Sequence, residues 1–325
     1  MKKLILINIL VVVLIILTGE MLLRVFSNIT VHGLDEGIIN YEDKPIFNYP
    51  GISNKKAFGK KIYTDTNGFR VQKKIEQEKK NKKNIYFVGG SVTFGKGVKQ
   101  ENTFTGILNK EIEDYNIINA GVVGSNLENN IEIIRTKINK KNLKYIFINY
   151  SLDDLANIDT IIKFKEKNID QKNTLYEKLK NNNLINYLNK FIRNKSVIYI
   201  MLKGYIFDIE KIFYQQALNF YKVDNNLKTL EKLIGNVSKL ESYNKIIFIM
   251  VPYSYQIEKE KCRKDDFAEK EIVKTITNKN IRLIRFKEFF CKDENREKIF
   301  FKYDPAHLSN YGHKLVANIL KQRLN

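Results

Sequence analysis

The sequence predicts an α/β fold of three layers, in which a five-stranded parallel sheet is covered by helices on both faces. Five short apolar segments rich in β-branched and aromatic residues are the predicted strands, namely residues 84–88, 116–119, 145–150, 245–251 and 281–286. The stretches between them leave room for helices. Strands that alternate with helices form parallel sheets, whose functional groups gather at the carboxyl ends of the strands.

Three segments predict helices that cover this sheet. Residues 103–115 and 126–140 carry apolar side chains three and four positions apart, which is the spacing of one buried helix face. The last segment, residues 309–324, repeats this spacing and begins at Ser309, whose hydroxyl can cap a helix. We expect all three helices to pack on the sheet.

An apolar N-terminal segment predicts a membrane anchor. Lys2 and Lys3 precede a run without charge over residues 4–18, and the apolar character resumes after Glu20 and continues to Arg24. The uninterrupted run is somewhat shorter than the roughly 20 residues of a spanning helix, which also suits a signal peptide. Because no cleavage site is evident, we expect residues 1–26 to be a retained single-pass anchor. The two lysines then lie inside the cell and the remainder outside.

The rest of the chain divides into an extension and a main domain. Residues 27–83 form a juxtamembrane extension and linker, in which an Asn-Gly pair at 67–68 predicts a tight turn. We expect Phe69 to pack on the main domain and Arg70 to reach its surface. Residues 84–325 form that domain, with a helical insertion at about 160–240. The sequence leaves open whether the insertion is a lid or a surface for a partner.

Composition excludes several classes of protein. The net charge is +20, but the lysines are scattered among Asn and Ile, so nucleic-acid binding is not predicted. Such a basic exterior suits anionic membranes or acidic glycans. Two cysteines, Cys262 and Cys291, exclude a disulfide-rich scaffold and a cysteine-based zinc site. Whether they pair is left open, and neither a cofactor, a metal nor an oligomeric state is predicted.

Two distant motifs predict a nucleophilic site. Gly89-Gly90-Ser91 follows the first predicted strand, so that Ser91 stands at a sharp turn into a helix. A serine hydroxyl needs a base within hydrogen-bond reach, and His307 near the C-terminus can provide one. Asp304, three residues earlier, can orient its imidazole. The alternative for Gly-Gly-Ser is a plain turn or an anion-binding loop.

At these residues the chain resembles the SGNH (GDSL-type) hydrolases, in particular a membrane-anchored branch associated with acyl groups on cell-surface glycans. Four patches carry the resemblance, from about residue 62 to the C-terminus apart from the insertion. They are Gly89-Gly90-Ser91-Val92-Thr93-Phe94-Gly95, Asn119-Ala120-Gly121-Val122, Ser151-Leu152-Asp153-Asp154 and Asp304-Pro305-Ala306-His307. The resemblance implies a flavodoxin-like arrangement of the sheet.

The resemblance also implies roles. Ser91 would be the nucleophile, His307 the base and Asp304 its orienting carboxylate. The amides of Ser91 and Gly121 would form an oxyanion hole. Its third donor in the family is an asparagine, where this chain has Asp153.

Two departures from the family pattern bear on catalysis. A carboxylate at position 153 opposes a developing negative charge unless it is protonated. Otherwise Asn149 or Asn157 would have to supply the third donor of the oxyanion hole. Gly90 stands where the family has aspartate, which mainly shapes the turn.

The expected function is a serine esterase or O-acyltransferase for acyl esters such as acetyl esters of a cell-surface polysaccharide. One alternative is an impaired enzyme that binds or assembles glycans, and another is a lipid esterase near the membrane. Three further polar residues have plainer interpretations. His313 is expected to be solvated, His32 to be structural or exposed, and Asp154 to bond loop amides.

Overall fold

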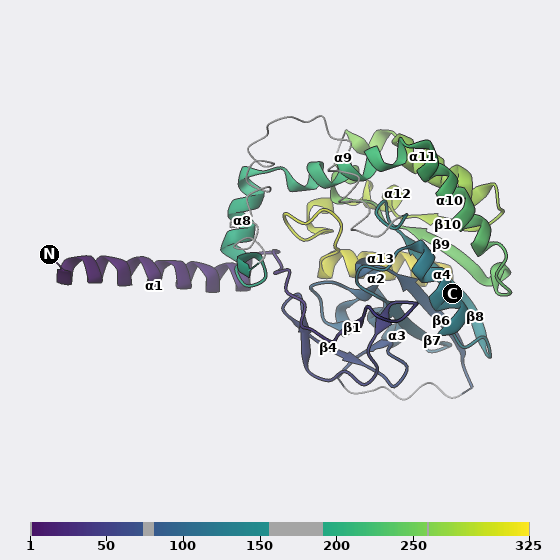
Figure 1. Ribbon diagram of the computed structural model, residues 1–325, viewed down its shortest axis with the longest axis horizontal. Coiled ribbons are helices and arrows are strands. Elements are labelled where there is room, and N and C mark those ends of the chain that lie inside the picture. Colours follow the sequence, from purple (N-terminus) through teal and green to yellow (C-terminus); the bar gives the residue numbers. More distant parts are fainter. Residues whose placement is uncertain (1, 74–80, 156–190, 259, 325) are drawn as a thin grey trace.

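The computed structural model describes residues 2–73, 81–155, 191–258 and 260–324 (Figure 1). Its centre is a parallel sheet in the spatial order β7-β6-β8-β9-β10. The order along the sheet is therefore 2-1-3-4-5, which is the flavodoxin-like arrangement. The strands are β6 (Lys83–Gly89), β7 (Tyr115–Gly121), β8 (Leu143–Tyr150), β9 (Ile246–Met250) and β10 (Arg282–Arg285). The predicted fold class and all five predicted strands are confirmed.

The sheet continues beyond the predicted strands into the N-terminal extension. β5 (Arg70–Val71) pairs antiparallel with β7, and β4 (Lys60–Thr64) and β3 (Lys55–Ala57) follow it outward. A separate hairpin joins β1 (Ile39–Asn40) to β2 (Phe47–Asn48). The predicted turn lies between β4 and β5, and Gly68 takes a φ of +84° that favours glycine there. The extension thus supplies antiparallel strands to one edge of the main sheet.

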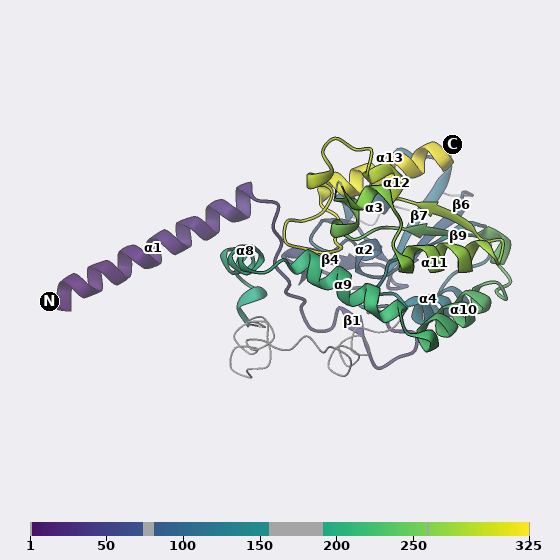
Figure 2. The same ribbon diagram turned by 90° about the horizontal axis from the view of Figure 1, so that it is seen from above.

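Helices cover both faces of the sheet, as Figure 2 shows from above. Side chains alternate along β6, so Ile85 and Phe87 belong to one core and Tyr86 and Val88 to the other. The first core is closed by α3 (Phe104–Glu111), α12 (Lys287–Phe290) and α13 (Asn310–Leu324). The second is closed by α4 (Leu127–Thr136), α10 (Asp224–Val237) and α11 (Phe267–Thr277).

The long connection between β8 and β9 is only partly an insertion. Its described part contains α8 (Val197–Ile206), α9 (Ile209–Tyr221) and α10. Since α10 buries Leu230, Leu233, Ile234 and Val237 in the core, it is the crossover helix that a parallel sheet requires. Residues 156–190, which include the first part of the predicted insertion, lie outside the described residues.

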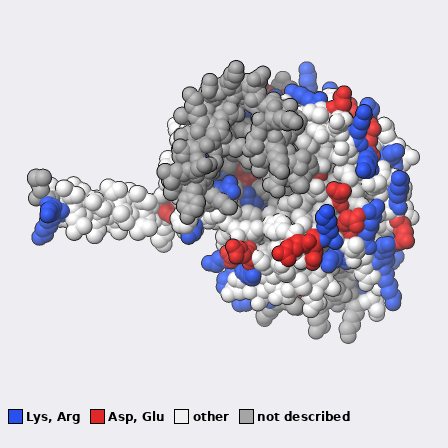
Figure 3. Space-filling model, viewed as in Figure 1, with Lys and Arg blue, Asp and Glu red and all other residues white. Residues whose placement is uncertain are grey.

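The first helix, α1 (Lys2–Phe26), projects from the domain with none of its residues buried (Figures 1 and 3). Among the described residues it is the one helix long and apolar enough to cross a membrane. Its 25 residues correspond to about 37 Å. Composition and length therefore allow either an anchor or a signal sequence.

Cys262 and Cys291 form a disulfide, which settles a pairing that the sequence left open. Their Cα atoms are 5.6 Å apart, and the bond ties the short 3₁₀ helix Lys261–Arg263 to the end of α12. Disulfides persist in oxidising compartments and are rare in the cytosol.

We predict that reduction of this disulfide destabilises the protein. The bond closes a loop with a sequence separation of 29 residues, and its loss should lower the free energy of unfolding by about 2–4 kcal/mol because the unfolded chain gains entropy. Urea unfolding with and without reductant measures this difference. The Cys262→Ser, Cys291→Ser double variant should have the same free energy of unfolding as the reduced protein, and reductant should not change it. Equal stability of the oxidised and reduced proteins would contradict the prediction.

Candidate functional site

Ser91 is the first residue of α2 (Ser91–Phe94), directly after the central strand β6. The turn into α2 leaves no room for a side chain at Gly89, two residues before the serine. A Cβ atom at Gly89 would lie 2.5 Å from Thr93 Oγ1 and 2.9 Å from Asn149 Cβ. Glycine at this position therefore lets the strand turn sharply and leaves the Ser91 hydroxyl at the carboxyl end of the sheet.

The structure brings Ser91, His307 and Asp304 into one hydrogen-bond chain. Ser91 Oγ lies 2.7 Å from His307 Nε2, and His307 Nδ1 lies 2.6 Å from Asp304 Oδ1. Because a carboxylate only accepts hydrogen bonds, Nδ1 carries the proton and Nε2 is free to accept from the serine. The three groups have the relative placement of a nucleophile, a base and an orienting acid.

The loop that carries His307 is fixed by its own backbone. Asp304 Oδ1 also accepts from the amides of Ala306 at 3.1 Å and His307 at 3.0 Å. An antiparallel bridge between Phe300 and Leu308 closes the base of the loop. Ser309 then begins α13, as predicted, and its hydroxyl accepts from the Gly312 amide at 3.2 Å. Hydrogen bonds within this loop therefore fix the positions of Asp304 and His307.

Lys96 is a buried amine beside this chain that the sequence analysis did not single out. Its Nζ lies 3.1 Å from Asp304 Oδ2 and 3.3 Å from His307 Nδ1, and its side chain is only 7% exposed. With Nδ1 protonated, the second contact brings two donors together and is repulsive. In the sequence Lys96 stands between two glycines and is one of many lysines. Nothing in the pattern therefore distinguished it from a surface residue.

His32, from the segment that follows α1, is the second acceptor for Lys96. Its Nδ1 lies 3.1 Å from Lys96 Nζ. The charge of Lys96, together with burial, holds the pKa of His32 well below its usual value, so the ring is neutral and accepts. The ring of Phe58 contributes a further cation–π contact at 5.1 Å. His32 thus has a structural place at the site.

Burial and charge set the protonation of the pair. Burial lowers the pKa of His307, Asp304 raises it and Lys96 lowers it again, with the net change downward. Burial alone would raise the pKa of Asp304, but the charges of His307 and Lys96 hold it well below the usual value. At neutral pH the resting site therefore combines a neutral imidazole with an ionised carboxylate.

A small pocket opens beside Ser91. It is lined by Gly90, Ser91, Val92, Gly124, Ser125, Asn149, Ser151, Asp153, Asp154 and Ala306. Most of these residues present polar or backbone groups, and Val92 and Ala306 are the apolar members. The pocket is suited to a short, polar group rather than to a long hydrocarbon chain.

The Gly121 amide, expected in the oxyanion hole, is committed elsewhere. It donates to Asn119 Oδ1 at 3.0 Å, and a Cβ atom at Gly121 would lie 2.2 Å from the amide nitrogen of Phe94. Gly121 is therefore packed against α2, away from the pocket. Gly124, three residues later, lines the pocket instead and has a φ of +81° with no atom within 4 Å of its Cβ position.

Asp153 lies in the pocket wall, and burial together with this carboxylate holds the pKa of Tyr253 well above its usual value. Asp153 thus presents carboxylate oxygen near Ser91. The expected role of Asp154 agrees with its contacts, since Asp154 Oδ2 accepts from the Ser151 amide at 2.7 Å. Burial raises the pKa of Asp154 well above its usual value.

Of the two asparagines considered as substitutes for a family donor, Asn149 lines the pocket and Asn157 lies outside the described residues. Asn149 is buried at the carboxyl end of β8, and its Oδ1 has no partner in the described part of the chain. A buried amide oxygen without a hydrogen-bond partner is energetically costly. Hydrogen bonding by this oxygen therefore does not explain why Asn149 is buried here.

Arg70 was expected to reach the surface of the main domain, but it lies buried inside it. Its side chain is 2% exposed, and its guanidinium donates to the carbonyls of Phe94, Gly95 and Val98. Those carbonyls follow the end of α2, so Arg70 holds the helix that carries Ser91. Burial lowers the pKa of Arg70 to about 9. The short strand β5 directs the side chain inward, which the sequence pattern did not reveal.

His313 was expected to be solvated, and this is wrong. It is 1% exposed on α13, where its Nδ1 accepts from the Phe104 amide at 3.2 Å and its ring stacks on Phe104. Burial lowers its pKa to about 3, so the ring is neutral. It caps the start of α3. Among the described residues no group of three acidic, histidine or cysteine side chains could hold a metal ion.

No protein-family model and no curated protein matches the sequence. Among solved structures, the chain is similar to the lipase/acylhydrolase from Enterococcus faecalis at 14% identity and a TM-score of 0.42, covering 74% of this chain and 95% of that chain. It is similar to an acetyl xylan esterase at 14% identity and a TM-score of 0.41, covering 74% and 100%. A two-domain esterase active on acetylated mannans is matched at 15% identity and a TM-score of 0.41, covering 74% of this chain and 48% of that chain.

We predict that the charge of Lys96 keeps the pKa of His307 low. Lys96→Gln retains a donor for Asp304 but removes the charge, and should raise the pKa of His307 because a nearby positive charge disfavours the imidazolium. Nuclear magnetic resonance of histidine-labelled protein measures this pKa, with His32 and His313 assigned through their glutamine variants. Lys99→Gln, which removes an exposed lysine nearby, should leave the titration unchanged. An unchanged His307 pKa in Lys96→Gln would contradict the prediction.

Proposed function

We propose that the chain is an SGNH-like serine esterase or O-acyltransferase that works through an acyl-enzyme. The observation that carries the proposal is the continuous hydrogen-bond chain from Ser91 through His307 to Asp304 at the edge of a pocket. A turn residue or an anion-binding loop would not require a histidine and a buried aspartate at these positions. The order of the four sequence patches supports the same conclusion.

In the proposed mechanism Ser91 Oγ attacks the carbonyl carbon of an ester while its proton passes to His307 Nε2. Asp304 stabilises the imidazolium that forms. The carbonyl oxygen becomes an oxyanion facing the amides of Ser91 and Gly124. His307 then gives its proton to the leaving alcohol as the carbon–oxygen bond breaks. Water or a sugar hydroxyl, deprotonated by His307, attacks the acyl-enzyme and releases Ser91.

Lys96 acts on this cycle as a positioning residue. Its bond to Asp304 Oδ2 leaves Oδ1 for His307 Nδ1 and the two loop amides. Its charge opposes formation of the imidazolium and so keeps His307 neutral at lower pH. The activity of the enzyme should therefore persist below the ordinary histidine pKa of about 6.5, because the base stays unprotonated there.

The substrate class follows from the pocket and from the proposed location. A small polar pocket favours a short acyl group such as acetyl over a lipid chain, which makes a lipid esterase the weaker alternative. If α1 is retained as an anchor, the disulfide supports a domain outside the cytoplasm. An acylated cell-surface polysaccharide is accessible from that position. Residues 1–26, 27–83 and 84–325 are then the proposed anchor, extension and hydrolase domain.

A second candidate function is glycan binding without turnover, and Asp153 favours it. A carboxylate in the pocket wall repels a developing oxyanion, whereas it can accept hydrogen bonds from sugar hydroxyls. Binding of a polysaccharide that survives Ser91→Ala, with no release of acyl groups by the wild-type protein, would favour this function.

The proposed nucleophile is tested by hydrolysis of a p-nitrophenyl ester series that begins with acetate. Ser91→Ala should lower kcat by about a thousand-fold or more, because no other group can form the acyl-enzyme. Ser238→Ala, at the end of α10 and outside the pocket, should keep the wild-type rate. Equal inactivity of the wild type and Ser91→Ala would end the hydrolase proposal.

The effect of Asp153 is tested by changing it to the amide. Asp153→Asn should raise kcat by about 10²-fold, because the amide removes the negative charge from the pocket wall and supplies an NH₂ donor for the oxyanion. Asp224→Asn, an exposed acid at the start of α10, serves as the matched control with an unchanged rate. A rate for Asp153→Asn at or below that of the wild type would show that the carboxylate does not limit turnover.

A further inference from the structure

Exposed apolar side chains gather beside the end of α1. In the described part of the chain, seven large apolar residues outside α1 are exposed, and four of them lie within residues 191–206. These four are Phe191 at 54%, Leu202 at 51%, Tyr205 at 83% and Ile206 at 64% exposed. The last three belong to α8, an apolar helix of 10 residues. Such a concentration on one short helix marks a surface for an apolar partner.

The start of α8 is fixed to α1 by one carboxylate. Glu20 accepts hydrogen bonds from the amides of Val197 at 2.9 Å and Ile198 at 3.0 Å, and from the Ser196 hydroxyl at 3.0 Å. These amides are the unpaired donors at the first turn of α8, where a negative charge is also favoured by the helix dipole. Arg24 adds a bond to the Lys195 carbonyl. The one acidic residue of α1 is therefore the cap of α8.

The two helices have the relative directions of a spanning helix and a surface helix. In Figure 1, α8 runs across the direction of α1, and Figure 2 shows α8 end-on. The uncharged run of α1 before Glu20, residues 4–19, is about 24 Å long, less than the roughly 30 Å of a hydrocarbon core. A bilayer crossed by α1 would therefore reach α8.

We propose that α8 lies in the outer interface of the bilayer that α1 crosses, with Leu202, Tyr205 and Ile206 inserted among the lipids. This inference rests on the proposed membrane anchor and assigns α8 to the same lipid surface. Exposed Arg193 and Lys195 precede α8 and suit anionic headgroups. Lys195 Nζ also lies 4.3 Å from the Phe191 ring centroid. Aromatic and basic side chains beside an apolar helix are typical of membrane interfaces.

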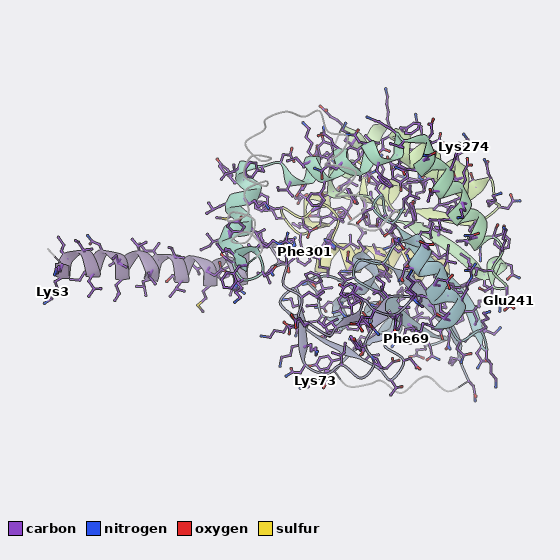
Figure 4. All side chains as sticks on the ribbon, in the orientation of Figure 1. Lys3, Phe69, Lys73, Glu241, Lys274 and Phe301 are labelled. Carbon is purple, nitrogen blue, oxygen red and sulfur yellow. A yellow bond between two sulfur atoms is a disulfide. The ribbon has the colours of Figure 1, made fainter. Side chains whose placement is uncertain are left out.

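Insertion of α8 among the lipids would set the distance of the active-site loop from the membrane surface. Gly204 of α8 lies so close to Tyr303 that a Cβ atom there would be 2.2 Å from Tyr303 Cγ. Tyr303 immediately precedes Asp304, and the Lys302 amide donates to the Asn28 carbonyl at 2.8 Å. Figure 4 shows the neighbouring Phe301 on the side of the domain that faces α1. The pocket thus works close to the membrane surface.

The absence of tryptophan from the sequence allows a direct test. Single tryptophans are introduced into the full chain by Tyr205→Trp, Leu202→Trp, Leu10→Trp and Phe267→Trp. Each protein is reconstituted in vesicles of phosphatidylcholine and phosphatidylglycerol, with bromine on the acyl chains either near the headgroup or near the chain ends. Leu10 lies within the uncharged run of α1 and marks the interior of the bilayer. Phe267 is an exposed aromatic in α11, a helix that lies away from α1 (Figures 1 and 2).

Tyr205→Trp and Leu202→Trp should lose about half or more of their emission to bromine near the headgroup, and less to bromine near the chain ends. Leu10→Trp should respond most to the deeper bromine, and Phe267→Trp to neither. Quenching of Leu10→Trp without quenching at 202 or 205 would overturn the inference and leave the anchor intact. If neither α1 nor α8 is quenched, both proposals fail. Quenching at positions 202 and 205 without quenching at position 10 would support membrane contact by α8 and contradict the proposal that α1 spans the membrane.

Discussion

The arrangement of the site depends on the hydrogen bonds that the buried carboxylate of Asp304 accepts. One oxygen accepts from the His307 ring and from two amides of its own loop, and the other accepts from Lys96. A buried carboxylate costs a large desolvation energy unless it is paired, so these donors are needed together. The charge of Lys96 satisfies Asp304 and at the same time lowers the basicity of His307. The same contact thus stabilises the loop and sets its chemistry.

Parts of the chain that look peripheral in the sequence therefore converge on this loop. Lys96 follows the helix that carries Ser91, and His32 reaches Lys96 from the segment after α1. Arg70, from an edge strand of the extension, holds the carbonyls beyond the end of α2. The extension is thus an integral support of the site. Its attachment to α1 and α8 links the pocket to the proposed membrane surface.

The sequence could predict the sheet because its signals are local. Apolar β-forming runs mark the strands, glycines 89 and 90 mark the turn before Ser91, and Asp304 and His307 are separated by a spacing that chemistry requires. The environment of Lys96 could not be predicted in this way, because burial depends on which distant elements pack around it. One lysine among many gives no sign that Asp304 and His32 will surround it.

The errors have similar causes. His313 was expected in solvent and Arg70 only at the surface of the main domain, because buried histidine and arginine side chains are uncommon, yet each satisfies backbone groups in the interior. Gly121 and Gly124 lie in the same short loop, and only the backbone path shows that the first amide bonds Asn119 while the second glycine lines the pocket.

The central claim is that Ser91 is a nucleophile activated by His307. Labelling with a fluorophosphonate, which reacts with activated serines, followed by peptide mass spectrometry tests it most directly, since no natural substrate is needed. The account predicts a single adduct on Ser91 that is lost in His307→Gln and kept in His313→Gln. No adduct on the folded wild-type protein, or one on Ser91 that persists without His307, would contradict it.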